Sequence, residues 1–228
     1  MVEQKRLAVG CTLALKGVVC EVGRNYQDRS DVEVVAEFAP TKVLIERVLA
    51  NSAADTVILT DAGAESLRRA GYLALDPIFV ARSSLGIAVR PGAPTPDISS
   101  IDKFKTFLDS GPRLAYSKSG ASGIYFAALV EQLGVSRVVG CFDIVDDGFT
   151  GERLLSGDAD YCVQQISELL YVRGIGPILP FPDEVQQHAV FVGCAIAGRQ
   201  VAEARRFISF LTELENRMSL ASWGLSAA

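Results

Sequence analysis

The chain has 228 residues, of which 49% are hydrophobic and 21% charged, and its formal net charge is −5. This length and composition predict a soluble globular protein with one long domain or two small lobes, and they exclude a disordered chain. The acidic, interspersed charge excludes a basic surface for nucleic acid, and no uninterrupted apolar run approaches the roughly 20 residues that a membrane-spanning helix needs.

The N-terminal residues imitate a secretory signal only in part. Lys5 and Arg6 precede an apolar run, but Lys16 and Gly17 interrupt it, and no small-x-small cleavage site follows at a suitable distance. These residues fit a first strand and helix better than a signal. We therefore predict a cytoplasmic protein, or a periplasmic one if a leader has been trimmed.

The cysteines point to a reducing compartment rather than to a disulfide framework. They are odd in number and form no C-x-x-C motif: Cys11, Cys20, Cys141, Cys162 and Cys194. Most lie in apolar segments, where a free cysteine behaves as a small hydrophobic residue. Because His188 is the sole histidine, we predict no zinc site, and no sequence motif indicates another metal or a cofactor.

The first part of the chain alternates strands with helices. Strands are predicted at Leu7–Cys11, Val32–Phe38 and Thr56–Thr60, and helices follow them through Val22, over Thr41–Ala50 and over Ala62–Ala70. Such a series implies a parallel sheet with helices on both faces.

A second series follows. It has strands at 85–90, 113–116, 142–145, 161–163 and 178–181, with helices at 101–109, 122–133 and 150–156. A strand at 189–196 and a helix at 200–215 close the chain. The simplest arrangement has two α/β lobes, residues 1–81 with 188–228 and the inserted residues 82–187. Ligands of such sheets bind at the carboxyl ends of strands, so the cleft between the lobes is the expected site.

The segment Arg113–Val135 resembles an anion-binding junction. Its strand is followed by the small and polar residues Ser117–Gly123 and then by a helix. The first turn of a helix has backbone N–H groups without internal partners, and here Ala121 and Gly123 would let an anion approach them, with the hydroxyls of Ser119 and Ser122 beside it. The alternative is an ordinary serine-capped helix.

Two further strand ends are candidate ligand contacts. Gln164 and Gln165 end a strand and could offer amides to a carboxylate, although adjacent strand residues face opposite ways and only one should reach the ligand. Phe149 and Thr150 begin a helix and are expected to line the cleft. His188 is expected to be a surface residue near the second crossing between lobes.

Six segments, in order and at compatible spacing, resemble the periplasmic molybdate-binding-protein family. They are "LALKGV" at 13–18, "EFAPT" at 37–41, "AADTVILT" at 53–60, "ARSSLGIAV" at 81–89, "GASGIY" at 120–125 and "QQISE" at 164–168. The resemblance covers nearly the whole chain and implies the type II periplasmic-binding-protein fold, in which two α/β lobes, each a mainly parallel sheet flanked by helices, close on a small anion.

The resemblance also implies where the ligand would bind. Members that bind molybdate hold it with hydroxyls and N–H groups of short loops before helices; here those loops carry Cys11 and Thr12, then Thr41, then Ser119–Ser122. Lys16, Lys42 and Arg82 fall near the implied cleft. Three cations suit a ligand with several carboxylates better than a compact oxyanion, although each singly could be a solvated residue.

One subgroup of this family, similar in sequence, is enzymatic: the aconitate isomerases, which shift a double bond within a tricarboxylate. Such a shift needs a proton-transferring group and cations that stabilise an enolate-like charge. Candidates for the first role are Glu168, Lys16 and Cys11, with Asp61 and Tyr125 as alternatives; Tyr125 is also a candidate ligand contact. Each also has a structural interpretation as a cap, a partner or a packed residue.

We therefore predict a protein that binds a small di- or tricarboxylate and isomerises it without a cofactor. The alternatives are a solute-binding protein that delivers molybdate or an organic anion to an ABC importer, and a sensor of such an anion. The sequence predicts no nucleic-acid partner and no membrane insertion.

Overall fold

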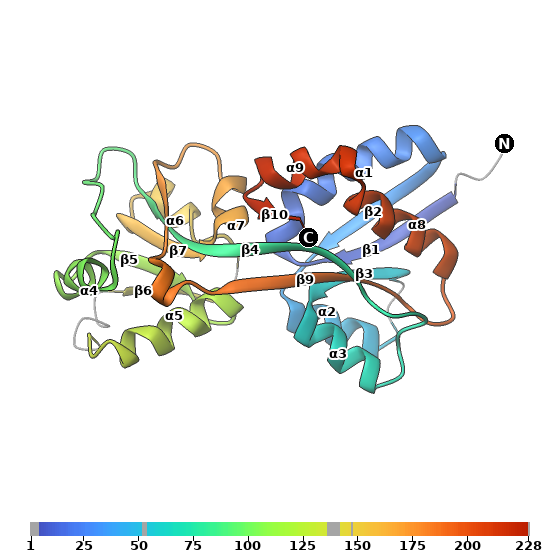
Figure 1. The fold of residues 1–228 in the computed structure, drawn as a ribbon, viewed down its shortest axis with the longest axis horizontal. Helices are drawn as coiled ribbons and strands as arrows, with labels where there is room; N and C mark the ends of the chain where they lie inside the picture. Colours follow the sequence, from blue (N-terminus) through green and yellow to red (C-terminus); the bar gives the residue numbers. More distant parts are fainter. Residues whose placement is uncertain (1–4, 52–53, 136–141, 147, 228) are drawn as a thin grey trace. The chain divides into compact units, whose positions relative to one another are not determined.

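The computed structural model describes residues 5–51, 54–135, 142–146 and 148–227, which form two units (Figure 1). Unit 1 contains the described residues up to Ser83 and those from Ala189 onward, and unit 2 is Ser84–His188. The predicted lobe boundaries, after Ala81 and after Gln187, lie close to these divisions. The α/β fold class is confirmed.

The sheet of unit 1 has the strand order β2-β1-β3-β9-β4. Its strands are β1 (Lys5–Cys11), β2 (Val32–Phe38), β3 (Thr56–Thr60), β4 (Ile78–Val89) and β9 (His188–Ala195). As predicted, β1 runs parallel to both β2 and β3. In contrast, β9 is antiparallel to β3, and the short β10 (Leu225–Ser226) is antiparallel to β4.

Alternation of side chains divides the apolar residues of unit 1 between two cores. Leu7, Val9 and Cys11 of β1 join the core formed with α1 (Lys16–Ser30), α8 (Val201–Thr212) and α9 (Arg217–Ser222). Val57 and Leu59 of β3 point to the other face, where they contact α2 (Thr41–Leu49) and α3 (Asp61–Arg69). Full burial of such side chains stabilises the fold by about 1.5–3 kcal/mol each.

Unit 2 has the strand order β4-β7-β5-β6, with β8 also paired to β4. The added strands are β5 (Leu114–Ser117), β6 (Phe142–Val145), β7 (Tyr161–Gln165) and β8 (Ile178–Pro180). β5 is parallel to β6 and β7, whereas β4 is antiparallel to β7 and β8. The carboxyl ends of the parallel strands β1, β2 and β3 therefore lie at one edge of the sheet of unit 1. Those of β5, β6 and β7 likewise lie at one edge of the sheet of unit 2.

Two cores also flank the sheet of unit 2. One contains α4 (Ile101–Asp109) and α5 (Ala121–Gln132), packed on Leu114 and Tyr116. The other contains α6 (Glu152–Ser156) and α7 (Ile166–Tyr171), packed on Ala115 and Cys162. No helix among the described residues has the length and apolar character needed to cross a bilayer.

Several predicted bounds were wrong. The first helix continues past Val22 to Ser30, because Tyr26 still falls on its buried face. β4 begins at Ile78 rather than Leu85. The last predicted helix ends at Thr212, where Glu213 takes an extended conformation; 3-10 turns lie at Leu13–Leu15, Asp183–Val185 and Leu214–Asn216. α7, α9 and β10 were not predicted.

Candidate functional site

Three loops of unit 1 follow parallel strands at one edge of the sheet. Cys11, the last residue of β1, is in register with Phe38 of β2 and Ile58 of β3. Backbone hydrogen bonds fix the loops there: Thr12 N–H donates to Ile58 O at 3.0 Å, and Ala39 N–H to Cys11 O at 3.1 Å. The predicted ligand loops of this unit therefore begin side by side.

Thr12 carries an unpaired buried hydroxyl. The residue is only 5% exposed, and its Oγ1 is the buried side-chain oxygen without a hydrogen-bond partner in the described part of the chain. An unsatisfied buried polar group costs about 1–3 kcal/mol. The fold therefore holds a donor and acceptor at the end of β1 that no described protein group uses.

The helices that follow β2 and β3 begin differently. Pro40 precedes α2 and supplies no side-chain cap, so the first-turn N–H groups at Thr41 and Lys42 are open to an anion. At α3, Thr60 Oγ1 accepts from Gly63 N–H at 3.3 Å and Asp61 Oδ1 from Ala62 N–H at 2.8 Å. Thr60 is thus the N-cap of α3 and Asp61 is its first residue, and the alternative that Asp61 transfers a proton stays a prediction.

The three predicted cations lie at different positions of unit 1. Lys16 begins α1, and its Nζ is 5.4 Å from the centroid of the Phe38 ring at the end of β2. Lys42 is exposed in the first turn of α2. Arg82 is exposed on β4, with its guanidinium carbon 5.7 Å from the ring centroid of Phe79.

Cys11 is a core residue. It is fully buried, and its Sγ lies 3.3 Å from the Thr12 carbonyl oxygen. Burial raises the pKa of its thiol well above the usual value, so the thiol stays protonated. The prediction that Cys11 transfers a proton is not supported. Cys20, Cys162 and Cys194 are also free thiols, and Cys141 lies outside the described residues.

Unit 2 has a corresponding edge, because β5 is parallel to both of its neighbours. Ser117 is in register with Val145 of β6, and Tyr116 with Val163 of β7. The ends of these strands and the segments that follow them carry Ser119 and Ser122, Phe149 and Thr150, and Gln165 and Glu168. All are predicted site residues or their neighbours.

The loop between β5 and α5 is held by its own hydroxyls. Ser117 Oγ accepts from Gly120 N–H at 2.9 Å, and Ser119 Oγ donates to Asp146 O at 2.8 Å. No side chain caps α5, whose first turn contains the exposed Ala121 and the buried Ser122. A Cβ on Gly123 would lie 1.6 Å from Ser117 O, so only glycine lets the helix start here. The first turn is therefore open to an anion.

Three predicted ligand contacts in unit 2 have structural roles. Gln164 Oε1 accepts from Thr150 N–H at 2.9 Å, and its Nε2 donates to Gly148 O at 3.1 Å. Phe149 stacks on Tyr171 with ring centroids 5.0 Å apart. Tyr125 Oη donates to Val185 O at 2.9 Å, and burial raises the pKa of its phenol. These contacts do not support the predicted ligand roles of Gln164, Phe149 and Tyr125.

Gln165 and Glu168 form a capping box at the start of α7. The Glu168 carboxylate accepts from Gln165 N–H at 3.3 Å, while the Glu168 side chain is only 9% exposed. Burial raises the pKa of this carboxyl to about 7, and the hydrogen bond from Gln165 opposes that shift. A carboxyl with such a pKa can accept and return a proton near neutral pH.

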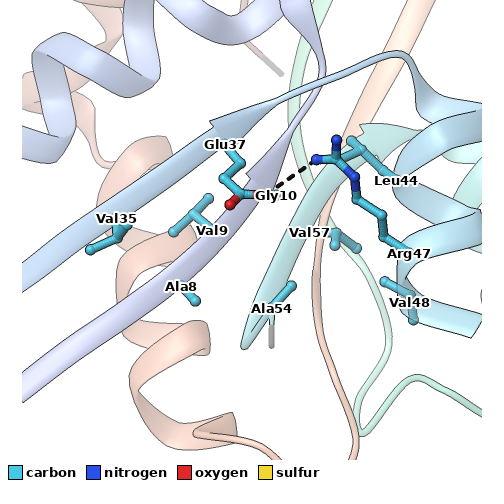
Figure 2. A pocket seen from close by; sticks show the side chains of 10 residues that line it. All are labelled: Ala8, Val9, Gly10, Val35, Glu37, Leu44, Arg47, Val48, Ala54 and Val57. Atoms are coloured by element: carbon cyan, nitrogen blue, oxygen red, sulfur yellow. Dashed lines mark hydrogen bonds and ion pairs between the residues drawn. The ribbon is translucent and has the colours of Figure 1, made fainter. Parts of the chain in front are cut away.

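Unit 1 also has an apolar pocket that the sequence did not predict. Its volume is about 190 Å³, and residues of β1, β2, β3 and α2 line it, among them the small residues Ala8 and Gly10. Figure 2 shows the side chains of Glu37 and Arg47 pointing toward each other. Arg47 Nη1 lies 3.2 Å from Glu37 Oε2 in an ion pair. The predicted ligand contacts Thr12, Thr41 and Lys42 are not among its lining residues. In the described ranges, no group of three or more His, Cys, Asp or Glu residues is placed to hold a metal.

Residues 7–226 match the bacterial extracellular solute-binding protein family, and the chain belongs to it. The predicted family resemblance is thereby confirmed. A curated relative, aconitate isomerase from a Pseudomonas species, is 29% identical over 92% of this chain and 84% of its own length.

Two solved structures share the fold. The periplasmic molybdate-binding protein of Azotobacter vinelandii is 14% identical, with a TM-score of 0.82 over 97% of this chain and 99% of its own. Peb3 from Campylobacter jejuni is also 14% identical, with a TM-score of 0.74 over 97% of this chain and 100% of its own. These likenesses establish the two-lobed fold of periplasmic binding proteins.

Roles as helix caps were among the sequence interpretations of Asp61 and Glu168, but Thr60 was not predicted as an N-cap, nor Gln165 as the partner of Glu168. Thr60 and Asp61 are standard capping residues, so α3 could have been distinguished from α2 and α5, which follow Pro40 and Gly120. Gln165 and Glu168 have the three-residue spacing of a capping box. The burial of Glu168 and of the Thr12 hydroxyl depends on tertiary packing and has no local signal.

Proposed function

We propose that this protein binds a small di- or tricarboxylate and shifts a double bond in it by 1,3-allylic proton transfer. The observation that carries the proposal is the similarity to aconitate isomerase over 92% of the chain. Membership of a solute-binding family supports a small ligand.

Three features support an anionic ligand. The Thr12 hydroxyl is unpaired among the described residues, the first turns of α2 and α5 lack side-chain caps, and Lys16, Lys42 and Arg82 supply positive charge in unit 1. Hydroxyls, open N–H groups and cations are the groups that bind carboxylates. The binding of the ligand between the two lobes stays a prediction.

Glu168 is the proposed proton-transferring group. Its carboxylate would remove a proton from a carbon next to a substrate carboxylate, so that the C–H electrons form a new double bond and the negative charge spreads over an allylic system. Cations and N–H groups stabilise that charge. The protonated Glu168 then returns the proton to the far carbon, and the double bond has moved with no net change in atoms or charge. Lys16 stays the second candidate for this role.

Removing single cations tests the binding part of the proposal. Lys42→Ala and Arg82→Ala should each raise the Kd for trans-aconitate about tenfold or more, because each loses a charged contact, measured by calorimetry at low salt. Lys105→Ala is the matched control, since Lys105 is exposed on α4, a helix that carries no candidate site residue. If neither Lys42→Ala nor Arg82→Ala changes the Kd for trans-aconitate, the proposed cationic site is rejected.

The second candidate function is binding without chemistry, in which the protein carries molybdate or an organic anion to an ABC importer or senses it. The family to which the chain belongs favours this alternative. Strong thermal stabilisation by micromolar molybdate, with no isomerisation of any carboxylate, would establish it in place of the enzyme. The cytoplasmic location also stays a prediction.

A further inference from the structure

Trp223 lies against the helix that carries Lys16. A Cβ added at Gly17 would come within 2.4 Å of Cδ2 and Cε3 of the Trp223 indole, so the ring rests directly on the backbone of α1 at the residue after Lys16. No side chain larger than that of glycine fits between them. The position of the first turn of α1 therefore depends on this ring.

A hydrogen bond fixes the ring in place. Trp223 Nε1–H donates to Glu21 Oε2 at 2.8 Å, one helical turn beyond Gly17. The indole thus contacts α1 at two points, an apolar contact at Gly17 and a polar contact at Glu21. Two contacts a turn apart resist both translation and rotation of the helix end, which a single apolar contact would not do.

The residues after Trp223 pair with β4, the strand that carries Arg82. β10 is antiparallel to β4, with Leu225 in register with Ser83 and Ser226 with Arg82. Leu225 is 3% exposed and belongs to the same core as α1. Residues 217–226, which contain α9 and β10, therefore contact the main-chain neighbours of both Lys16 and Arg82.

We propose that Trp223 is a positioning residue for Lys16, and that residues 217–226 hold Lys16 and Arg82 in the geometry that binds carboxylates. This inference rests on the proposed function, because it assumes that Lys16 contacts the ligand. Trp223 itself touches no ligand in this account. Its role is to keep the Lys16 ammonium at the end of β2, where it lies over Phe38.

A double-mutant cycle tests the coupling. Trp223→Ala and Lys16→Ala should each raise the Kd for trans-aconitate about tenfold, and the double variant should differ from Lys16→Ala alone by less than about twofold. Leu67→Ala is the stability control: Leu67 is fully buried on α3, and its loss should lower Tm and leave Kd unchanged. If the Kd of the double variant is raised by the product of the two single effects, the two substitutions act independently and the inference is overturned.

If Trp223→Ala fails to fold, two milder substitutions at Glu21 test the same contact. Glu21→Ala removes the acceptor of the indole N–H and should weaken binding, whereas Glu21→Gln keeps an acceptor and should restore it. In addition, Trp223 is the sole tryptophan of the sequence, so its emission should change when trans-aconitate is added and stay constant in Lys16→Ala.

The outcomes separate this inference from the proposed function. If the wild-type protein binds no carboxylate, the proposed function fails and the inference falls with it. If Lys16→Ala leaves Kd unchanged while Lys42→Ala and Arg82→Ala raise it, the cationic site stands and the inference is overturned. If Lys16→Ala weakens binding but Trp223→Ala and Glu21→Ala do not, the cation site stands and the positioning role is rejected.

Discussion

At the scale of single residues, a substitution at Thr12 should raise the stability of the free protein and lower its affinity for the ligand. Thr12→Val removes the unpaired buried hydroxyl at nearly constant volume, so the free protein should gain up to about 1 kcal/mol in unfolding free energy. The same change should weaken trans-aconitate binding, because a ligand hydrogen bond is lost. Denaturant titration and calorimetry measure the two effects.

Thr56→Val is the matched control. Thr56 is also fully buried, but its hydroxyl donates to Cys194 O at 2.9 Å. Its replacement should cost about 1 kcal/mol and leave binding unchanged. A loss of stability in Thr12→Val like that in the control would show that the Thr12 hydroxyl has a protein partner after all.

Glu168 gives a pH dependence of stability. Its pKa rises from the ordinary 4.5 to about 7 in the folded protein, so between these values the folded state binds a proton that the unfolded chain releases. The contribution of this carboxyl to stability is therefore complete below pH 4.5 and is lost as the pH rises through 7. Glu168→Gln does not ionise and should gain on the order of 3 kcal/mol relative to wild type between pH 4.5 and 8.

Glu65 serves as the control, because the pKa of its carboxyl is shifted in the opposite direction. Hydrogen bonds from Arg68 and Arg69 lower the pKa of its exposed carboxyl. Glu65→Gln should therefore show no gain in stability relative to wild type as the pH rises. If the unfolding free energies of Glu168→Gln and wild type stay parallel over this range, the Glu168 carboxyl is ionised and solvated, and its proposed role loses its physical basis.

Residue types predicted the site only in part. Thr12 and Lys42 were predicted from the family resemblance, and Ser122 from the small and polar loop before a helix. Gln164 was predicted from the end of a strand, Phe149 from the start of a helix and Tyr125 from the family resemblance, and all three hydrogen-bond or stack within unit 2. The sequence shows which groups follow a strand; it does not show which of them the protein itself already uses.

At the scale of secondary-structure elements, the junction of β5 and α5 depends on a glycine. Gly123→Ala would bring a Cβ within 1.6 Å of Ser117 O, a backbone atom at the end of a buried strand. The helix start must then move, and we expect a loss of about 3 kcal/mol, measured by denaturant unfolding, together with weaker anion binding.

Gly23→Ala is the matched control in α1. There a Cβ would lie 3.6 Å from Val34 Cγ1, an ordinary contact, and alanine favours the helix by about 1 kcal/mol over glycine. This variant should be as stable as wild type or more so. Equal stability of the two alanine variants would mean that α5 starts elsewhere than at the end of β5.

The helices and strands with a clear periodic pattern of apolar residues were predicted most accurately. β2, β3, β6 and α4 were predicted to their observed ends, because apolar alternation or a capped amphipathic pattern defines them locally. α9 and β10 are short, and they adjoin tertiary contacts such as those of Trp223 with Gly17 and of Ser226 with Arg82. α7 is equally short, and its local signal is a capping box rather than a period. No periodicity analysis of so few residues could identify them.

At the scale of the whole molecule, two α/β units each carry parallel strands that end in short loops before helices. The alternating series of strands and helices predicted this arrangement, and the family match agrees with it. The fold alone does not distinguish a carrier from an enzyme. Only an observation of chemistry on the bound molecule can do so.

The most direct test follows cis- and trans-aconitate by NMR in deuterated water with the purified protein. The account predicts interconversion of the two isomers, with a rate lowered about 10²–10⁴-fold by Glu168→Gln. Failure of the wild-type protein to interconvert them, while it binds trans-aconitate measurably, would contradict the proposed isomerase and leave a binding protein.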